Sequence, residues 1–238
     1  MHRGLPLVLI ASLLGAAGAQ GQQLASAVPD SPGPVTTLDV APTTLDLKPG
    51  VAGLFYVTNH GAHAVTVQIE AMDWQQGDGR DRLAPSRLLL TSPPMARIAP
   101  GGRQSVRVLA RVDAGHEHAF RLLVSQLPDA AGESDGVHVL LQFSVPVFAG
   151  HDSTAQPRLR WLERDGSLIA VNDGSQTVKL EALHVNGDFR GGLTYLLPGA
   201  ARNLGSATPG AQIAVHEGRT NRDLSGTVIQ ADSADAPW

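Results

Sequence analysis

Apolar and polar residues alternate along much of the chain. In residues 64–74 (AVTVQIEAMDW), Val65, Val67 and Ile69 fall on one side of a period-2 pattern and polar residues fall on the other, which is typical of a strand with one buried face. The same alternation recurs in residues 104–111, 120–127 and 137–148. Turn-forming pairs such as Pro100-Gly101 separate these segments. The pattern therefore predicts an all-β protein, folded as an antiparallel sandwich of the immunoglobulin type.

A second set of strands follows a polar joint at residues 150–157 (GHDSTAQP). Asp165-Gly166 and Asn186-Gly187 are strong hairpin signals, and they mark strands at residues 159–163, 168–171 and 177–185. We therefore predict two domains after the N-terminal region: an immunoglobulin-like domain at residues 36–149, and a β-sandwich domain at residues 150–238 that ends in a loose tail from Ala231.

An internal similarity supports two related sandwiches in tandem. The segment VTNHGAHAVTVQIEA (residues 57–71) resembles VNDGSQTVKLEA (residues 171–182), and a Pro-Gly pair follows each of them further along the chain. Landmarks that repeat in the same order favour two related sandwiches over one large barrel.

The N-terminus has the pattern of an export signal. A short basic start precedes an apolar run at residues 5–17, which is too short for a comfortable membrane span. Ala17 and Ala19 supply the small side chains that signal peptidase requires before its cleavage point. We predict a signal peptide at residues 1–19, a flexible linker at residues 20–35, and an exported, soluble mature chain that begins at Gln20.

Composition and charge exclude several classes of function. The chain has 18 Lys and Arg against 22 Asp and Glu, for a net charge of −4, so nothing favours nucleic acid or an anionic membrane as a partner. The absence of Cys excludes disulfides and thiol chemistry. The histidines cluster only in His116-Glu117-His118 and at His60 and His63, beside turns and without the spacing of a metal motif. Solvated loop histidines are therefore favoured, and no metal or other cofactor is predicted.

One short motif suggests catalysis. Gly132 to Gly136 (GESDG) matches the G-x-S-x-G elbow of serine hydrolases, which exposes its Ser on a strand-to-helix turn. Here an alternating apolar strand follows the motif, so the required helix is missing and a polar hairpin loop explains the match equally well. A hydrolase that uses Ser134 remains an alternative.

Three segments carry a resemblance to a known family. In order along the chain they are TSPPMARIAPGGRQSVRVL, EHAFRLLVSQLP and VHVLLQFSVPVF, which begin at Thr91, Glu117 and Val137. Together they closely resemble the periplasmic pilus chaperones, and in particular the branch that serves spore-coat-protein-U-like subunits. The resemblance implies a non-enzymatic chaperone of two immunoglobulin-like domains. Such a chaperone captures pilin-like subunits by donor-strand complementation and delivers them to an outer-membrane usher.

The same resemblance identifies a donor strand at residues 137–148. One face of this strand would fill the pockets of a subunit that lacks a strand, and it carries Val137, Val139, Leu141, Phe143 and Val145. Leu140 serves the opposite face, so the strand is apolar on both sides, unlike an ordinary surface strand. The alternative is that these residues fill the core of the protein itself.

The resemblance also exposes a departure from the family. Well-studied members hold the terminal carboxylate of the subunit with an Arg and a Lys, and the matching positions here are Thr44 and Pro146, which carry no charge. We expect a displaced anchor at Arg121, whose guanidinium could bind a carboxylate through two hydrogen bonds. Arg107 and Arg111 are weaker candidates, and an ordinary exposed Arg121 is the alternative. A secreted immunoglobulin-like module with another ligand remains the alternative function.

Overall fold

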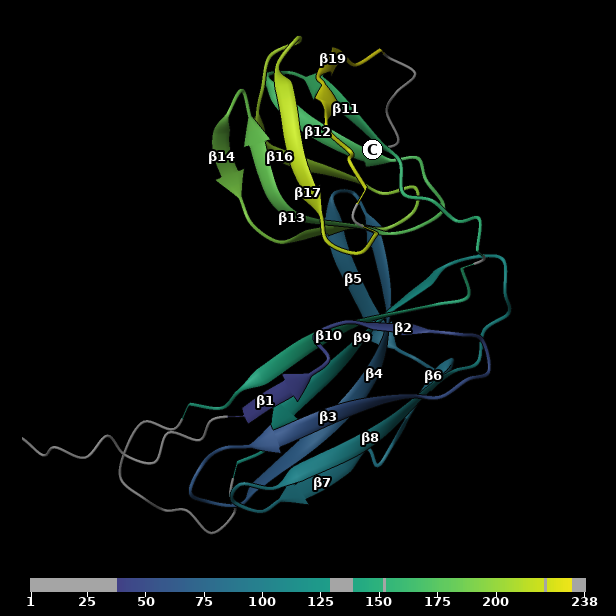
Figure 1. The fold of residues 1–238 in the computed structure, drawn as a ribbon, viewed down its shortest axis with the longest axis vertical. Coiled ribbons are helices and arrows are strands. Elements are labelled where there is room, and N and C mark those ends of the chain that lie inside the picture. The colour runs from purple at the N-terminus through teal and green to yellow at the C-terminus, as the bar shows by residue number, and fades with distance from the viewer. Residues whose placement is uncertain (1–37, 129–138, 152, 221, 233–238) are drawn as a thin grey trace, which may run out of the picture. The chain divides into compact units, whose positions relative to one another are not determined.

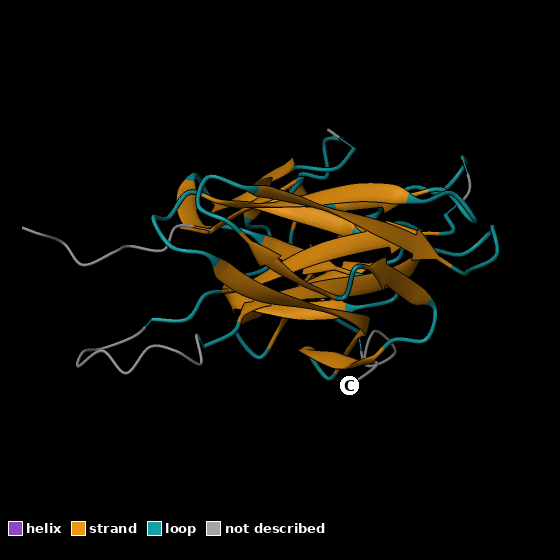
Figure 2. Ribbon diagram, turned by 90° about the horizontal axis from the view of Figure 1, so that it is seen from below, coloured by secondary structure: helices purple, strands orange, loops and turns teal. Residues whose placement is uncertain are grey.

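The structure, a computed structural model, describes residues 38–128, 139–151, 153–220 and 222–232. Regular secondary structure in these residues is entirely β-strand, in two sandwiches of two sheets each (Figures 1 and 2). The prediction of two immunoglobulin-like sandwiches is thereby confirmed. No helix in these ranges is both long and apolar enough to span a membrane. The predicted signal peptide (1–19), the linker (20–35), Ser134 and Val137 lie outside the described residues.

The N-terminal sandwich packs a four-stranded sheet against a larger one. The first sheet has the order β1 (Leu38–Ala41), β3 (Gly53–Asn59), β8 (Arg103–Ala110), β6 (Leu89–Ser92). The second has the order β2 (Leu45–Leu47), β10 (Gln142–Ala149), β9 (His118–Gln126), β4 (Val65–Gly77), β5 (Arg80–Pro85), and β7 (Met95–Ile98) also pairs with β4.

The inward faces of these two sheets form the first core. On β4 the alternation in the sequence is the alternation of burial, because Val65, Val67 and Ile69 are each exposed by 5% or less. Phe55 of β3 and Phe120 of β9 join them in one apolar cluster. Each such side chain stabilises the fold by about 1.5–3 kcal/mol relative to an exposed position.

The C-terminal sandwich repeats this layout with shorter strands. One sheet has the order β16 (Ala201–Ser206), β12 (Ser167–Asn172), β11 (Leu159–Arg164), β19 (Ile229–Gln230). The other has the order β14 (Asp188–Gly191), β13 (Val178–Val185), β17 (Gln212–Glu217), β18 (Gly226–Thr227), and β15 (Thr194–Leu196) also pairs with β13. Its separate core includes Trp161, Leu168, Leu180 and Leu196.

The two predicted hairpin turns are present. Asp165 and Gly166 have φ of 49° and 76°, and Asn186 and Gly187 have φ of 52° and 88°. Positive φ at both central residues is the requirement of the tight turn that matches the twist of a hairpin, and Asp, Asn and Gly meet it at low cost.

The internal similarity corresponds to a repeated side-chain hydrogen-bond motif. Asn59 and Asn172 are both fully buried and stand at the end of β3 and β12. Each accepts a hydrogen bond from the amide of the glycine two residues later and donates to the carbonyl four residues later, at His63 and Gln176. Each also donates across the sandwich, to the carbonyl oxygen of Ile98 or Leu196. One buried amide therefore fixes the loop after an equivalent strand in both domains.

Two expectations about strands need correction. The sequence predicts one strand at residues 137–148, but β10 begins only at Gln142, because its partner β9 ends at Gln126. Antiparallel pairing is also not universal: β2 runs parallel to β10, and β11 runs parallel to β19. Ala231, which the sequence places in a loose tail, donates its amide to the carbonyl oxygen of Glu163.

Candidate functional site

In the part of the chain that the structure describes, one edge of β10 has no partner strand over most of its length. The strand pairs with β9 from Gln142 to Ala149, whereas β2 covers its other edge only at Val147, Phe148 and Ala149. In the described chain, residues 142–146 therefore present backbone groups that no neighbouring strand uses. A strand edge of this kind accepts an added strand from another chain.

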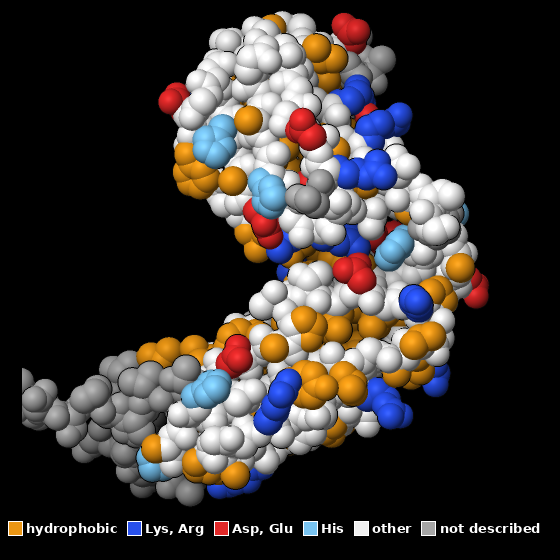
Figure 3. Space-filling model, viewed as in Figure 1, with side chains coloured by type: hydrophobic (Ala, Val, Ile, Leu, Met, Phe, Trp, Pro, Cys, Tyr) orange, Lys and Arg blue, Asp and Glu red, His pale blue; other side chains and the backbone are white. Residues whose placement is uncertain are grey.

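The exposure of the predicted donor residues falls along the chain from Val139 to Val145. Val139 is 73% exposed, and Leu140, which the alternation places on the opposite face, is 47% exposed. Figure 3 shows that hydrophobic side chains reach the surface of the N-terminal sandwich in several places. Leu141 and Phe143 are partly buried against the first core.

The fifth predicted contact, Val145, lies in the core of the protein itself and is only 2% exposed. It stands opposite Leu122 in the register with β9, and both side chains point between the sheets. The alternative reading of this face therefore applies to Val145, whose methyl groups are not available to a partner. The reason is that the opposite sheet packs over only part of this strand face. Residues under that sheet are buried in the core, and residues beyond its edge are exposed.

Arg121 stands directly beside Pro146, because the two residues are opposite each other in the antiparallel register of β9 and β10. Its guanidinium carbon lies 3.7 Å from the ring centre of Trp74 and 5.2 Å from that of Tyr195. Desolvation lowers the pKa of Arg121 from its ordinary value, and the neighbouring charge of Arg202 adds to this effect. Arginine nevertheless stays protonated in proteins.

The guanidinium of Arg121 makes cation–π contacts but no hydrogen bond or ion pair with any residue that the structure describes. A half-buried cation without an anion is unfavourable, since burial removes water without supplying a counter-charge. Arg121 is therefore neither an ordinary exposed strand residue nor part of an internal ion pair, and its hydrogen-bond donors are available to an outside acceptor.

Thr44, the other uncharged position, lies at the same site. Its hydroxyl oxygen is 3.5 Å from the hydroxyl oxygen of Tyr195. Tyr195 is only 7% exposed. Its ring packs edge-on against Trp74, with ring centres 5.6 Å apart, and also contacts Phe148, with ring centres 6.1 Å apart. The fold thus gathers Thr44, Pro146 and Arg121 around one aromatic cluster. The sequence did not single out Tyr195, because its contacts are to residues far away in the chain.

A buried ion pair lies close to this cluster. The Glu117 side chain is fully buried, and its Oε2 lies 3.1 Å from Nη1 of Arg219, which is 5% exposed. The other oxygen accepts the amide of Thr177 at 2.6 Å, and Arg219 also pairs with Asp46. Asp46 on β2 and Glu117, just before β9, in this way connect the first sandwich to the turn after β17 in the second.

The histidine groups lie outside the site around Arg121. Among the described residues, no group of three or more His, Asp or Glu side chains could hold a metal ion. His60, His63 and His116 are exposed, and Glu117, between His116 and His118, is committed to Arg219.

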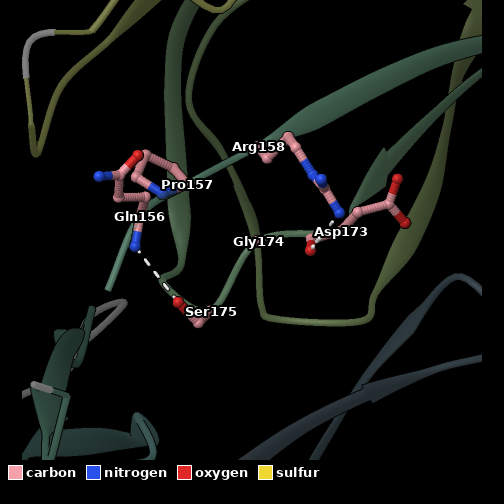
Figure 4. A pocket seen from close by; sticks show the side chains of 6 residues that line it. All are labelled: Gln156, Pro157, Arg158, Asp173, Gly174 and Ser175. Carbon is pink, nitrogen blue, oxygen red and sulfur yellow. Dashed lines mark hydrogen bonds between the residues drawn. The ribbon is translucent and has the colours of Figure 1, made fainter. Parts of the chain in front are cut away.

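A polar pocket of about 430 Å³ lies in the C-terminal sandwich (Figure 4) and is lined by Gln156, Pro157, Arg158, Asp173, Gly174 and Ser175. The Gln156 amide donates to the Ser175 hydroxyl at 3.2 Å, and Arg158 donates to the carbonyl oxygen of Asp173. These groups satisfy one another, and none of the predicted site residues lines the pocket.

Comparisons with known proteins agree with this architecture. Residues 38–150 match the family described as pili and flagellar-assembly chaperone, PapD N-terminal domain. The fold is similar to a chain of the CsuC–CsuE chaperone–tip adhesion subunit pre-assembly complex from archaic chaperone-usher Csu pili of Acinetobacter baumannii, at 20% identity, 82% of this chain, 100% of that chain and a TM-score of 0.70.

Two further solved structures are similar. They are the chaperone DraB of E. coli (18% identity, 81% of this chain, 97% of that chain, TM-score 0.63) and a chain of the complex of the SafA pilin with the SafB chaperone from Salmonella enterica (17% identity, 81% of this chain, 93% of that chain, TM-score 0.62). At these identities the likeness establishes the fold. No curated protein matches the sequence.

Proposed function

We propose that this chain, which belongs to the pilus-assembly chaperone family through its N-terminal sandwich, captures pilin-like subunits in the periplasm and delivers them to an outer-membrane usher. It would act by lending β10 to a subunit that lacks one strand, which is a form of β-augmentation. This is a binding function without catalysis. Membership in the branch that serves spore-coat-protein-U-like subunits stays a prediction, as does cleavage after Ala19.

The observation that carries the proposal is the open edge of β10. No described strand pairs with one edge of residues 142–146, and the exposed apolar residues Val139 and Leu140 precede them. An exposed apolar strand edge promotes aggregation and is normally protected. Its retention beside otherwise well-packed sheets supports a functional role as a pairing surface. The donor contacts we propose are Val139, Leu141 and Phe143, with Val137 as an untested member.

Arg121 is the proposed carboxylate anchor. It lies opposite Pro146 on the neighbouring strand, it has no acidic partner of its own among the described residues, and its planar fork of donors suits a carboxylate. A terminal carboxylate held there would fix the register of an extended segment added along β10. Arg107 and Arg111 remain weaker candidates and lie on the other sheet or just after it.

Charge substitutions on the donor strand test the proposal. Burying a valine contributes about 1.5–3 kcal/mol, so the loss of that burial in Val139→Asp should weaken capture by at least about tenfold to a hundredfold while the chaperone stays folded. The assay is co-purification with a strand-rich exported subunit encoded beside this chain, followed by titration of the purified pair. Val51→Asp is the matched control, because Val51 is a 55% exposed valine outside β10.

The result that would contradict the proposal is normal capture by Val139→Asp and by Leu141→Asp, with circular dichroism unchanged. Two rival functions have their own readouts. Covalent labelling at Ser134 by a fluorophosphonate would support a hydrolase. Failure to bind any strand-deficient subunit, together with tight binding of an unrelated ligand, would support a different immunoglobulin-like module.

A further inference from the structure

Two hydroxyl groups belong to the aromatic cluster that packs against Arg121, whose guanidinium lies 5.2 Å from the ring centre of Tyr195 and has no ion pair with any described residue. They belong to Thr44, just before β2, and to Tyr195 on β15, and their oxygen atoms are 3.5 Å apart. This separation is longer than the usual hydroxyl–hydroxyl hydrogen bond of about 2.7–2.8 Å. The two groups therefore satisfy each other only weakly, and both can turn toward a stronger acceptor.

Tyr195 is held in place by contacts that do not use its hydroxyl. The side chain of Gln76 donates to the Tyr195 carbonyl at 2.9 Å and accepts the Leu197 amide at 2.9 Å, so the end of β4 binds the backbone of β15 on both sides of Leu196. The ring of Tyr195 is fixed by Trp74 and Phe148. A rigidly held donor of this kind loses little conformational entropy when it binds.

The charges around the site favour an anion. Asp81 is the acidic side chain that acts electrostatically on Arg121, but it is engaged by Arg202 at 2.7 Å and by Gln76 at 2.8 Å. It therefore does not neutralise Arg121. The guanidinium and the two hydroxyls are hydrogen-bond donors, and a carboxylate accepts about four hydrogen bonds.

We propose that Tyr195 and Thr44 complete a carboxylate-binding site with Arg121, and that Tyr195 donates its hydroxyl hydrogen to the terminal carboxylate of the captured subunit. The inference rests on the proposed function and deepens it. Because β15 belongs to the C-terminal sandwich, that sandwich would contribute directly to affinity. It would also make the chaperone selective for a free chain terminus over an internal strand of the same composition.

A pair of peptides tests this assignment. The probes are fluorescent decapeptides of alternating valine and threonine, one ending in a free carboxylate and one in an amide, titrated by fluorescence anisotropy into the full mature chain. Wild type should bind the acid more tightly than the amide. A hydrogen bond to a charged group is worth about tenfold to a hundredfold in affinity, so Tyr195→Phe should reduce the acid-to-amide ratio by about that factor. Amide binding should not change.

The chain offers a matched control, since Tyr56 is its other tyrosine and stacks under Arg103 on the other sheet. Tyr56→Phe should leave the acid-to-amide ratio at the wild-type value. An unchanged ratio in Tyr195→Phe, together with a collapsed ratio in Arg121→Ala, would overturn the role of Tyr195 and leave the proposed function intact. Peptide binding that is indifferent to the terminus and survives Val139→Asp would overturn both.

Discussion

The ion pair between Glu117 and Arg219 gives a stability prediction whose size follows from its geometry. Glu117→Gln keeps the size of the side chain and an oxygen for the Thr177 amide, but removes the charge 3.1 Å from Arg219. Removing one partner of a buried pair costs about 3–5 kcal/mol, because the other charge stays buried. Asp46 still pairs with Arg219 and is half exposed, so we expect about 3 kcal/mol, the lower end of that range.

Urea unfolding, followed by circular dichroism and tryptophan fluorescence, measures this cost. Each sandwich contributes a buried tryptophan, Trp74 to the first and Trp161 to the second. With the third tryptophan, Trp238, replaced, replacing either Trp74 or Trp161 by a non-fluorescent residue leaves the other to report on its own sandwich. The pair connects the sandwiches, and Glu117→Gln should therefore split a shared transition as well as lower its midpoint. Asp46→Asn is the control, and this exposed partner should cost under about 1 kcal/mol.

A double variant separates the charge effect from packing. Arg219→Met in the Glu117→Gln background leaves no unpaired charge and should recover most of the lost stability, as replacement of both members of a buried pair often does. A loss of under about 1 kcal/mol in Glu117→Gln, equal to that of Asp46→Asn, would refute the reasoning. It would mean that the Glu117 carboxylate is not buried against Arg219 in solution.

Two further predictions concern buried polar groups. Asn172→Ala should lower the free energy of unfolding of the C-terminal sandwich by about 2–4 kcal/mol, because it leaves the carbonyls of Gln176 and Leu196 and the Gly174 amide without their partner. Urea denaturation measures this loss. Asn172→Asp should not restore the stability, because a carboxylate cannot donate to the two carbonyls. Burial tends to raise the pKa of Glu217, but hydrogen bonds from Thr220 and from backbone amides outweigh it and hold that pKa below the ordinary 4.5. The ionised carboxylate therefore stabilises the fold above about pH 4.5, the ordinary pKa, and this stabilisation is lost as the pH falls through the lower pKa of the folded state. The urea midpoint of the wild type should drop between these two pH values, and the midpoint of Glu217→Gln should change less.

The sequence predicted the elements whose evidence is local. Alternation located the strands of both sandwiches, and Asp165-Gly166 and Asn186-Gly187 located two hairpins, because period and turn chemistry depend on neighbouring residues. Even the buried role of Asn59 and Asn172 had a local signal, in the repeated VTN and VND segments. The sequence could not separate the residues of the predicted donor strand (137–148) that are exposed from those that are buried. Val139 and Val145 have the same place in the alternation, and only the position of the opposite sheet makes one exposed and the other buried.

Contacts across long stretches of chain were beyond the pattern. Glu117 was grouped with the histidines beside it, but its charge partner Arg219 is 102 residues away. Tyr195 reaches Thr44 over 151 residues, and neither residue carries a mark of this in its own segment. Such pairs are set by how the two sandwiches contact each other, a property that no window of sequence contains.

The proposed anchor shows how a local departure from a family can be offset on the neighbouring strand. Pro146 cannot carry the charge that the resemblance implies for its position, and a comparison of that position alone would indicate a lost site. Directly opposite residues on antiparallel strands have their Cβ atoms only about 4.5–5.5 Å apart, which is within the reach of one long side chain. Arg121 is the residue opposite Pro146, so a cation on β9 can occupy nearly the same point above the sheet as a cation on β10. What function requires is then a positive charge at this position on the sheet surface, and either β9 or β10 can supply it.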